Sequence, residues 1–365
     1  MENISKHIVV VGAGISGLCT AYWLKKSGFN VTVFESDSEP GGTMKTIRKD
    51  GWLIETGPNS ALETTPLLRE LFDQLKITDQ LLYANDTASK RFIVRNSMLN
   101  VLPMGLGSFL STRLWSTGGK LRLLKEPFIK KALKEESIAE FVTRRLGKEF
   151  LDYAINPFVA GVYAGSPEKL SVQSAFPKLY ALEANYGSLM KGAIKSSSER
   201  KKRKEIAKDR ARLFSFSNGM QTLPNRLAEA LGDSLQFSTQ VEHVVPMRVG
   251  RYPKYTISIT HNAFRTSVEA DAVVLSTPAY VTSKIIKPID PEMASMLDAI
   301  YYPPVTEIFL GFERDQIKRP LDGFGFLVPE IEKKNILGCI WSSSLFPNRA
   351  PDKRVALTSF VGGSR

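Results

Sequence analysis

The chain has 365 residues, of which 43% are hydrophobic, and its formal net charge is +12. This length and apolar content suffice for a sizeable core and for one to three domains. No apolar run reaches the roughly eighteen residues of a membrane-spanning helix, and the two cysteines and three histidines show no metal-ligand spacing. We therefore expect no transmembrane segment and no metal site, and the early first strand predicts a cytoplasmic chain without a signal peptide.

The first predicted element is a buried parallel strand at residues 8–11, where four β-branched residues follow one another. Three glycines come directly after it in the spacing G-x-G-x-x-G. In that spacing the first glycine permits a tight turn, the second lets a pyrophosphate approach the backbone, and the third lets helix and strand pack closely. The three glycines are Gly12, Gly14 and Gly17.

A helix and a second strand complete this pattern. The helix begins near residue 18 and ends at Gly28, and its N-terminus directs free N–H groups at a phosphate. The strand at residues 31–34 ends on Glu35, 18 residues after Gly17, where an acid can bind ribose hydroxyls. Strand, glycines, helix and acid together predict a dinucleotide site. The alternative is an ordinary βαβ turn with incidental glycines.

Residues 36–103 predict turns, hairpins and one helix. Gly41 and Gly42 mark a turn with a close backbone approach. Residues 44–56 form a hairpin that turns at 49–51, and a further turn follows at 57–60. A helix begins at Pro66 with Thr64 or Thr65 as its N-cap, and residues 90–103 form a second hairpin that turns at 95–97.

The middle of the chain is predicted to be helical. Residues 104–147 are amphipathic, and Ser137 with Glu140 forms a capping box at the start of one helix. A second helix is expected to run up to Pro157. Residues 196–210 lack large apolar side chains apart from Ile206 and predict a mobile loop or an exposed helix.

The last part of the chain is predicted to be mostly strands. Residues 213–231 predict a strand, a turn and a helix that begins near Thr222. The apolar run at 272–277 is typical of a parallel strand that returns to the first domain. Further antiparallel strands are expected at 301–312 and 323–344.

Basic residues are concentrated in two regions, residues 120–148 and 195–212. For the second region a nucleic-acid patch and a solvated charged segment are the alternatives, and we favour the solvated segment. Residues 101–134 mix Leu, Phe and Trp with seven Lys or Arg. This pattern is typical of attachment to an anionic membrane surface, and the alternative is a helix packed on a cavity with a basic outer face.

Taken together, these segments resemble the flavin-containing amine oxidase superfamily. Its signature of strand, glycine-rich turn, helix, strand and acid is followed here by the paired glycines and by a G-W-x-I-E-x-G-P element at 51–58. Within the superfamily the chain resembles the oxygen-dependent protoporphyrinogen oxidase family. That closer resemblance depends on residues 57–60, 156–171, 301–305 and 342–355. Related enzymes often have a basic residue shortly before the paired glycines, whereas this chain has Ser38-Glu39-Pro40.

The resemblance implies an α/β fold with three parts: a Rossmann-like (GR2-type) FAD-binding domain, a mixed antiparallel substrate-binding sheet and a helical insertion. We expect residues 1–90 and 212–285 to form a discontinuous FAD-binding domain. Residues 91–200 would be the helical, membrane-associated insertion, and residues 286–365 an incomplete substrate-binding sheet. Family members continue beyond the point that corresponds to Arg365, so we expect a C-terminally truncated chain.

The resemblance also implies the residues that hold FAD. They are Gly12, Gly14, Gly17, Glu35, Gly41, Gly42, Gly57, Asn59 and Val244. The alternative for Asn59 is a plain turn asparagine, and the alternative for Val244 is a core valine.

A porphyrinogen substrate would be held by Arg91, whose planar guanidinium suits a propionate. Gly165 would leave room for the macrocycle, and an apolar slot would be formed by Leu327, Leu337 and Phe346. The alternatives are a surface arginine, a turn glycine and ordinary core residues.

The activity that the resemblance implies is FAD-dependent oxidation of protoporphyrinogen IX to protoporphyrin IX, with dioxygen as acceptor, in heme biosynthesis. We expect no catalytic side chain, because the flavin carries the chemistry. The expected partners are the porphyrinogen, dioxygen, an anionic membrane surface reached from the inner face and a second copy of the chain, but no nucleic acid. The alternatives are a coproporphyrinogen III oxidase, another flavin oxidase acting on amines or carotenoids, and an inactive truncated chain that binds FAD weakly.

Overall fold

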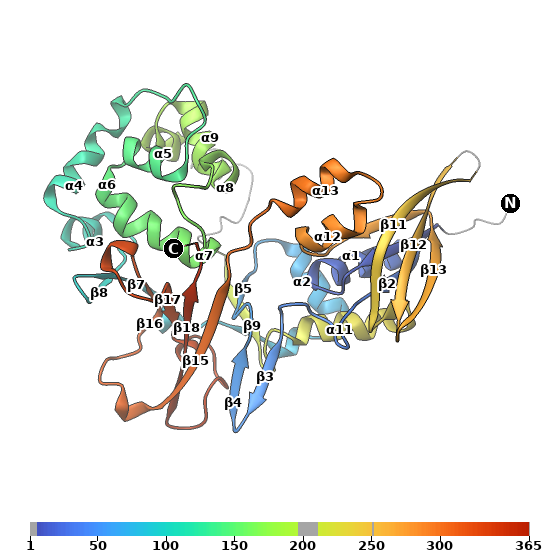
Figure 1. Ribbon diagram of the computed structural model, residues 1–365. Helices are drawn as coiled ribbons and strands as arrows, with labels where there is room; N and C mark the ends of the chain where they lie inside the picture. Colours follow the sequence, from blue (N-terminus) through green and yellow to red (C-terminus); the bar gives the residue numbers. More distant parts are fainter. Residues whose placement is uncertain (1–5, 196–210, 250–251, 365) are drawn as a thin grey trace. The chain divides into compact units, whose positions relative to one another are not determined.

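The computed structural model describes residues 6–195, 211–249 and 252–364. The chain forms two compact units. Unit 1 comprises Met1–Leu82 and Leu213–Tyr302, and unit 2 comprises Tyr83–Arg212 and Pro303–Arg365. Each unit is therefore built from segments that lie far apart in the sequence (Figure 1).

Unit 1 contains a parallel sheet with the strand order β10-β2-β1-β14. The β-branched run near the start of the chain forms the inner strand β1, whose side chains from Ile8 to Val11 are all buried. Val10 pairs with Val33 on one side and with Val274 on the other. The parallel strand predicted at 272–277 is therefore confirmed over residues 272–275. The strands are β1 (His7–Val11), β2 (Asn30–Phe34), β10 (Leu235–Gln236) and β14 (Ala272–Leu275).

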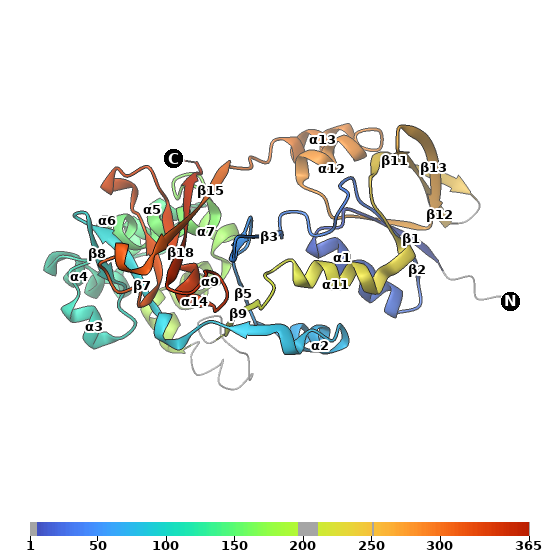
Figure 2. The same cartoon turned by 90° about the horizontal axis from the view of Figure 1, so that it is seen from below.

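Helices and a second sheet pack around these parallel strands. Helix α1 (Ile15–Lys26) lies beside α11 (Thr222–Leu231), as both views show (Figures 1 and 2). Val9, Phe34 and Ile257 share one core cluster, which joins the parallel strands to the antiparallel sheet β11-β12-β13. The remaining elements of this region are β11 (Thr239–Val249), β12 (Tyr252–His261), β13 (Phe264–Ala270), α12 (Ala279–Ile286) and α13 (Pro291–Asp298).

The rest of unit 1 agrees with the predicted hairpin and helix. Strands β3 (Thr46–Lys49) and β4 (Trp52–Glu55) pair antiparallel around a turn at residues 50–51. The N-cap of α2 (Pro66–Gln74) is Thr65, whose side chain accepts from the Leu67 N–H. A small sheet has the order β5-β9-β6. Its strands, with one 3₁₀ turn, are β5 (Ala61–Leu62), η1 (Thr78–Gln80), β6 (Leu81–Tyr83) and β9 (Leu213–Phe216).

Unit 2 is organised around a mixed sheet with the order β15-β18-β17-β16-β7-β8. Strands β16 and β7 pair parallel, and every other neighbouring pair is antiparallel. The sheet thus unites residues near 95 with residues near 340. Its strands are β7 (Lys90–Arg95), β8 (Met98–Val101), β15 (Val305–Glu313), β16 (Gly323–Leu327), β17 (Gly338–Ile340) and β18 (Arg354–Gly362).

Helices of unit 2 gather on one side of this sheet in the view of Figure 1. Ile93 of β7 belongs to the same buried cluster as Phe141 of α5 and Val159 of α7, so the helices and the sheet share a core. The helical elements are α3 (Leu106–Ser111), α4 (Thr117–Arg122), η3 (Leu123–Phe128), α5 (Ile138–Arg145), α6 (Lys148–Phe150), η4 (Leu151–Ile155), α7 (Asn156–Tyr163), α8 (Val172–Ala175) and α9 (Pro177–Tyr186). Unit 2 also contains the short helical turns η2 (Asp86–Ala88), η6 (Arg314–Gln316), η7 (Glu330–Glu332) and α14 (Ser342–Leu345), and unit 1 contains η5 (Gly232–Ser234).

The predicted α/β fold and the capping box are confirmed. Ser137 Oγ accepts from the Glu140 N–H at 3.2 Å, and Glu140 Oε2 accepts from the Ser137 N–H at 2.9 Å. The expectation that a helix ends at Pro157 is wrong, because α7 continues through this proline to Tyr163. A π-turn precedes it, and a proline is tolerated in the first helical turn because its missing N–H would have no partner there.

The boundaries of the two units differ from those expected. Residues 90–101 form strands of the large sheet and not part of a helical insertion, and residues 291–298 form a helix of unit 1. The predicted loop or helix at 196–210 lies outside the described residues. In the part of the chain that the structure describes, no helix is long and apolar enough to cross a membrane.

Candidate nucleotide site and apolar cavity

The turn between β1 and α1 combines one tightly packed glycine with one open glycine. A Cβ atom on Gly17 would stand 2.0 Å from the carbonyl oxygen of Gly12 and 2.4 Å from Ser276 Oγ. A Cβ atom on Gly14 would meet nothing within 4 Å. Gly17 is therefore required by the packing of helix on strand, whereas the space beside Gly14 is free for a ligand.

The N-terminus of α1 faces that free space. Gly14 is the N-cap and has no side chain, and the first turn of the helix contains no acidic residue. The first N–H groups of a helix have no partner within the helix, and the helix dipole adds positive potential at this end. The turn is therefore suited to bind a phosphate group.

Glu35 closes the other side of the site. Its side chain is buried at the end of β2, where Oε2 accepts from the Ala13 N–H at 2.6 Å. Oε1 accepts from the Asp37 N–H at 2.9 Å. A third bond, from the Ser36 hydroxyl to Oε1 at 3.1 Å, helps fix the carboxylate beside the glycine turn. Oε2 keeps a lone pair that a ribose hydroxyl could use.

The paired glycines pack directly against the first turn. The Gly41 N–H donates to the Ala13 carbonyl at 2.8 Å, and Gly41 forms a β-bridge with Gly14. Gly42 lies so close that a Cβ atom on it would be 3.5 Å from Gly14 Cα. The two glycine-rich turns thus form a single backbone surface.

A cation that the sequence analysis missed lies next to this surface. The Lys45 Nζ atom is 2.8 Å from Glu39 Oε1 and 3.7 Å from Asp37 Oδ2. The hydrogen bond to Glu39 raises the pKa of Lys45, so its charge is retained. We looked for a basic residue only before the paired glycines, but here it follows Gly42 by three positions.

Three further residues are expected at the cofactor, namely Gly57, Asn59 and Val244, and all three lie in unit 1. A Cβ atom on Gly57 would stand 2.0 Å from the Thr43 carbonyl oxygen, so the 57–60 turn packs against the paired-glycine turn. Asn59 Nδ2 donates to the Gly57 carbonyl at 3.1 Å. Val244 is a core residue of β11, and contact between its backbone and a cofactor stays a prediction.

Unit 2 contains an apolar cavity of about 620 Å³. This volume lies within the range of small-molecule sites, roughly 300–1,000 Å³. The cavity lies between the helices and the mixed sheet. Ala154, Ile155, Phe158 and Val162 line it from the helical side, and Leu327 and Leu337 line it from the side of the sheet.

Arg91 is the only charged side chain among the described residues that line this cavity. Its guanidinium carbon is 5.5 Å from the centroid of the Phe324 ring. A cation–π contact of this kind uses the face of the guanidinium, so the N–H edges remain available to a carboxylate. Cys339 also lines the cavity, and burial raises the pKa of its thiol, so it stays neutral.

Three of the five residues expected to contact the substrate line the cavity, namely Arg91, Leu327 and Leu337. Gly165 is not among the lining residues, and a Cβ atom on it would be 2.8 Å from Leu170 Cδ1. Phe346 is buried beside the Arg349 guanidinium, whose carbon is 5.3 Å from the ring centroid. The substrate roles expected of Gly165 and Phe346 stay predictions.

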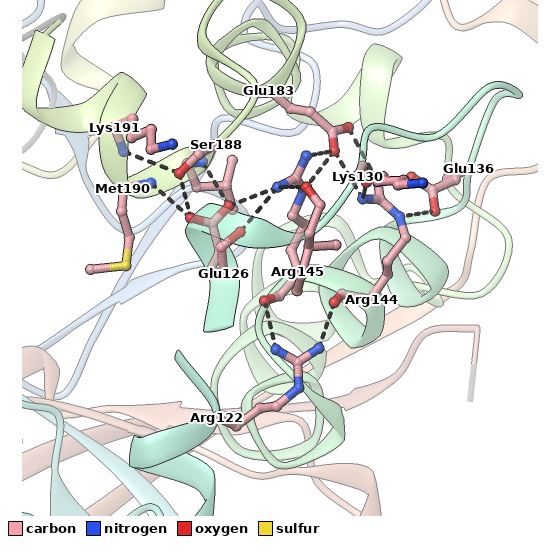
Figure 3. Close-up of polar contacts among 12 residues, drawn as sticks. Arg122, Glu126, Lys130, Glu136, Arg144, Arg145, Glu183, Ser188, Met190 and Lys191 are labelled. Carbon is pink, nitrogen blue, oxygen red and sulfur yellow. Dashed lines mark hydrogen bonds and ion pairs between the residues drawn. The ribbon is translucent and has the colours of Figure 1, made fainter. Parts of the chain in front are cut away.

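A buried ion cluster ties together the helices of the cavity wall (Figure 3). Arg145 of α5 has no exposed surface, and its Nε donates to Glu183 Oε1 of α9 at 2.6 Å. Its Nη1 lies 3.1 Å from Glu126 Oε1 of η3. Val142, on the same helix as Arg145, lines the cavity, as does Leu179 of α9. The cluster therefore fixes two helices that form the cavity wall.

Further hydrogen bonds complete this cluster. Glu126 accepts from the Ser188 hydroxyl at 2.6 Å and from the Leu189 N–H at 2.8 Å. Burial acts to raise the pKa of Glu126, but these hydrogen bonds and the charge of Arg145 outweigh it and hold the pKa below its usual range. Arg144 pairs with both Glu136 and Glu183, which raises its pKa further. No local sequence pattern indicates this cluster, because its charged members are separated by up to 57 positions.

Comparison with known proteins assigns the family. The sequence profile of the flavin containing amine oxidoreductases matches residues 15–365. The chain belongs to this family.

Individual relatives show which enzymes of the family the chain is similar to. The chain is 35% identical to protoporphyrinogen oxidase 2, chloroplastic/mitochondrial, of Arabidopsis thaliana over 390 residues, which cover 100% of this chain and 77% of that protein. It is 27% identical to coproporphyrinogen III oxidase of Bacillus subtilis (strain 168), over 99% of this chain and 78% of that protein. The predicted resemblance to protoporphyrinogen oxidases is thus confirmed, and membership of the family supports a flavin as cofactor.

A solved structure supports the fold. The crystal structure of a candidate protoporphyrinogen oxidase from Exiguobacterium sp. 255-15 has a TM-score of 0.78 to this chain at 23% identity. The similarity covers 98% of this chain and 77% of that one. At this identity the likeness shows that the two chains share a fold.

Proposed function

We propose that this chain oxidises protoporphyrinogen IX to protoporphyrin IX in heme biosynthesis, with FAD as cofactor and dioxygen as electron acceptor. The observation that carries the proposal is the large apolar cavity, in which Arg91 is the one charged residue among the described residues of the lining. The glycine-built nucleotide site in the same chain and the 35% identity to a plant protoporphyrinogen oxidase support it.

The residues of unit 1 fit FAD. Backbone N–H groups at the start of α1 and the open space at Gly14 would hold its pyrophosphate. Glu35 would accept a hydrogen bond from the adenosine ribose. When bound, FAD supplies the hydride-accepting chemistry.

The residues of unit 2 would bind the substrate without acting as acid or base. The apolar lining excludes water and accepts the carbon skeleton of a tetrapyrrole. Arg91 would fix its orientation through a charge-assisted pair with one propionate. Coproporphyrinogen III carries additional propionates where protoporphyrinogen IX has vinyl groups. Because no second cation lines the described part of the cavity, burial of those extra charges would be unfavourable.

Turnover and cofactor content of the purified chain test this proposal. We expect a flavin absorbance spectrum with FAD as the released nucleotide, and porphyrin fluorescence that develops faster from protoporphyrinogen IX than from coproporphyrinogen III. Faster turnover of coproporphyrinogen III would assign the alternative porphyrinogen activity. Bound FAD with oxidation of amines alone would assign another flavin oxidase, and absence of FAD would indicate an inactive chain.

Substitution of Arg91 tests the assignment of the cavity. A charge-assisted hydrogen bond contributes on the order of 1.5–3 kcal/mol, so Arg91→Ala should raise KM for protoporphyrinogen IX by about tenfold or more. Arg91→Lys should restore only part of the affinity, because an ammonium lacks the planar fork. Arg226→Ala, which removes a partly exposed arginine of α11, is the control. An unchanged KM in Arg91→Ala with normal FAD content would remove Arg91 from the site.

We also propose that unit 2 attaches to an anionic membrane surface through residues 104–134. Among the residues of this segment whose burial is described, six apolar ones are more than half exposed: Met104, Leu110, Leu121, Leu124, Phe128 and Leu133. Trp115, which the sequence pattern includes among the interfacial residues, is instead buried and stacked on Phe150, with ring centroids 4.4 Å apart. The seven Lys and Arg of residues 101–134 would add electrostatic attraction.

Co-sedimentation with vesicles tests this attachment. Binding should be stronger to vesicles that contain phosphatidylglycerol than to pure phosphatidylcholine. The pair Leu124→Ser and Phe128→Ser should weaken it, whereas Leu67→Ser, at an equally exposed leucine of unit 1, should not. Binding that is indifferent to anionic lipid and to the first two substitutions would contradict the proposal.

A further inference from the structure

The side chain of Asn156 joins two elements that line the cavity of unit 2. Asn156 is the first residue of α7, and its side chain is buried. Its Oδ1 accepts from the Glu330 N–H at 3.0 Å, and its Nδ2 donates to Glu330 Oε2 at 3.1 Å. Glu330 follows β16 by three residues. A single asparagine thus binds both the backbone and the side chain of Glu330, at the end of the opposite cavity wall.

The same two elements touch again farther along α7. A Cβ atom on Gly161 would stand 2.5 Å from Leu327 Cδ2, so helix and strand approach closely at this point. Phe158 lies between Asn156 and Gly161 in the sequence, and Val162 directly follows Gly161. Both side chains line the cavity. With one contact at Asn156 and a second at Gly161, the direction of α7 relative to β16 is fixed.

The backbone before α7 does not fix the helix by itself. Residues Leu151–Ile155 form a π-turn, and Pro157 has no N–H to donate. Wider π-turns often occur at functional sites. Ala154 and Ile155 of this turn line the cavity. The hydrogen bonds of Asn156 therefore stabilise the helix at the place where its backbone ladder is irregular.

We propose that Asn156 is a positioning residue that sets the width of the cavity for a flat tetrapyrrole by holding α7 against the end of β16. This inference rests on the proposed function, because it takes a porphyrin-sized molecule as the occupant. Asn156 itself touches no substrate in this proposal. It acts through Phe158 and Val162, whose positions depend on the start of α7.

The charged groups around Asn156 and Glu330 make a specific test possible. Asn156 and Glu330 border a small polar hollow that is also lined by Lys148, Asp152 and Glu168, and Lys148 pairs with Asp152. In Asn156→Asp the new carboxylate would face Glu330 across the distance of the lost hydrogen bond. Like charges at this distance raise the pKa of one carboxylate. Protonation at lower pH would then supply the missing donor.

The experiment measures the dissociation constant of protoporphyrin IX by its fluorescence, and KM and kcat for protoporphyrinogen IX, on the purified holoprotein. Asn156→Ala should weaken porphyrin binding and raise KM by about tenfold, with FAD content and kcat little changed. Asn156→Asp should bind more weakly at pH 8 than at pH 6. Adding Glu330→Gln to Asn156→Asp should restore binding at pH 8, because the glutamine amide can donate to the aspartate.

The control is Asn100→Ala, which removes the asparagine whose Nδ2 donates to the Met98 carbonyl in β8 and which is not among the described residues that line the cavity. A purely structural role of Asn156 would lower the melting temperature and FAD content without pH dependence or rescue by Glu330→Gln. Unchanged porphyrin affinity in a folded Asn156→Ala would overturn the proposal. Porphyrin binding without any turnover by the wild-type chain would refute the proposed function alone, since the binding measurement would still test Asn156. Absence of porphyrin binding by the wild-type chain would overturn both.

Discussion

The candidate sites of the two units are built in different ways. In unit 1 the nucleotide site consists mainly of backbone from residues 12–42, and its shape comes from glycines that bring chain segments into direct contact. In unit 2 the cavity is lined by side chains that come from as far apart as Arg91 and Phe360. Side-chain contacts such as the buried ion cluster hold its walls in place.

This difference determines how each site should respond to substitution. A backbone site fails when an added Cβ atom has no space, and the damage is local. A cavity between helices and a sheet fails when the contacts that hold its walls are lost, even if those contacts lie outside it. The largest effects are therefore expected in unit 2 from residues that no substrate touches.

The largest expected effect follows removal of the charge at the centre of the ion cluster. Arg145→Met would leave Glu126 buried without its cationic partner and Glu183 paired with Arg144 alone. Removal of one partner of a buried ion pair typically costs about 3–5 kcal/mol. We expect a loss of this size in the free energy of unfolding, measured by urea denaturation, together with weaker porphyrin binding. Arg354→Met, which breaks an exposed pair with Glu313, should cost no more than about 1 kcal/mol.

The pH dependence of stability gives a second view of the same cluster. The pKa of Glu126 is lowered in the folded chain, so its contribution is fully present above the pKa of an unfolded glutamate, about 4.3. The contribution is lost as the pH falls through the lower folded-state pKa. Between these two values the wild-type chain should lose stability with acid more steeply than Arg145→Met. Equal slopes for the two proteins would show that Arg145 does not influence the titration of Glu126.

A matched pair of glycine substitutions tests the backbone site of unit 1. Gly17→Ala would press a methyl group against the Gly12 carbonyl and should destabilise the chain by about 1–3 kcal/mol even without flavin. Gly14→Ala meets no protein atom and should leave the melting temperature of the apoprotein unchanged. It should still weaken FAD binding, because the methyl group would occupy the space of the pyrophosphate. Titration of both apoproteins with FAD, monitored by flavin fluorescence, separates the two effects. Normal FAD affinity in Gly14→Ala would place the phosphate elsewhere.

The sequence was most informative where neighbouring residues determine the structure. Gly12, Gly17 and Glu35 could be placed because strand, turn, helix and acid follow one another within thirty residues. The capping box at Ser137 depends on residues three positions apart and was equally accessible. Such local signals do not require knowledge of the tertiary fold.

Contacts between distant segments could not be predicted in this way. The bonds of Asn156 to Glu330 span 174 positions. Asn156 begins the 156–171 stretch that contributes to the family resemblance, but that resemblance assigns no role to either residue. The end of a helix at Pro157 was a reasonable expectation from the sequence, but the π-turn before it lets the helix continue. Lys45 was missed because we looked for the cation on only one side of the paired glycines.

The smallest predicted effect concerns the capping box of α5, which tests whether every contact on the helical side of unit 2 influences the cavity. Ser137→Ala removes the hydroxyl that accepts from the Glu140 N–H, and loss of such a cap typically costs about 1 kcal/mol. The bond lies at the exposed start of α5, whereas Val142 and Arg145 are buried farther along the helix. We therefore expect a slightly lower melting temperature with unchanged FAD content and porphyrin affinity, and Ser137→Asn should recover most of the stability because asparagine also caps helices. Weaker porphyrin binding in Ser137→Ala would mean that the start of α5 is coupled to the cavity wall, and the ion cluster would then not be sufficient to hold that wall in place.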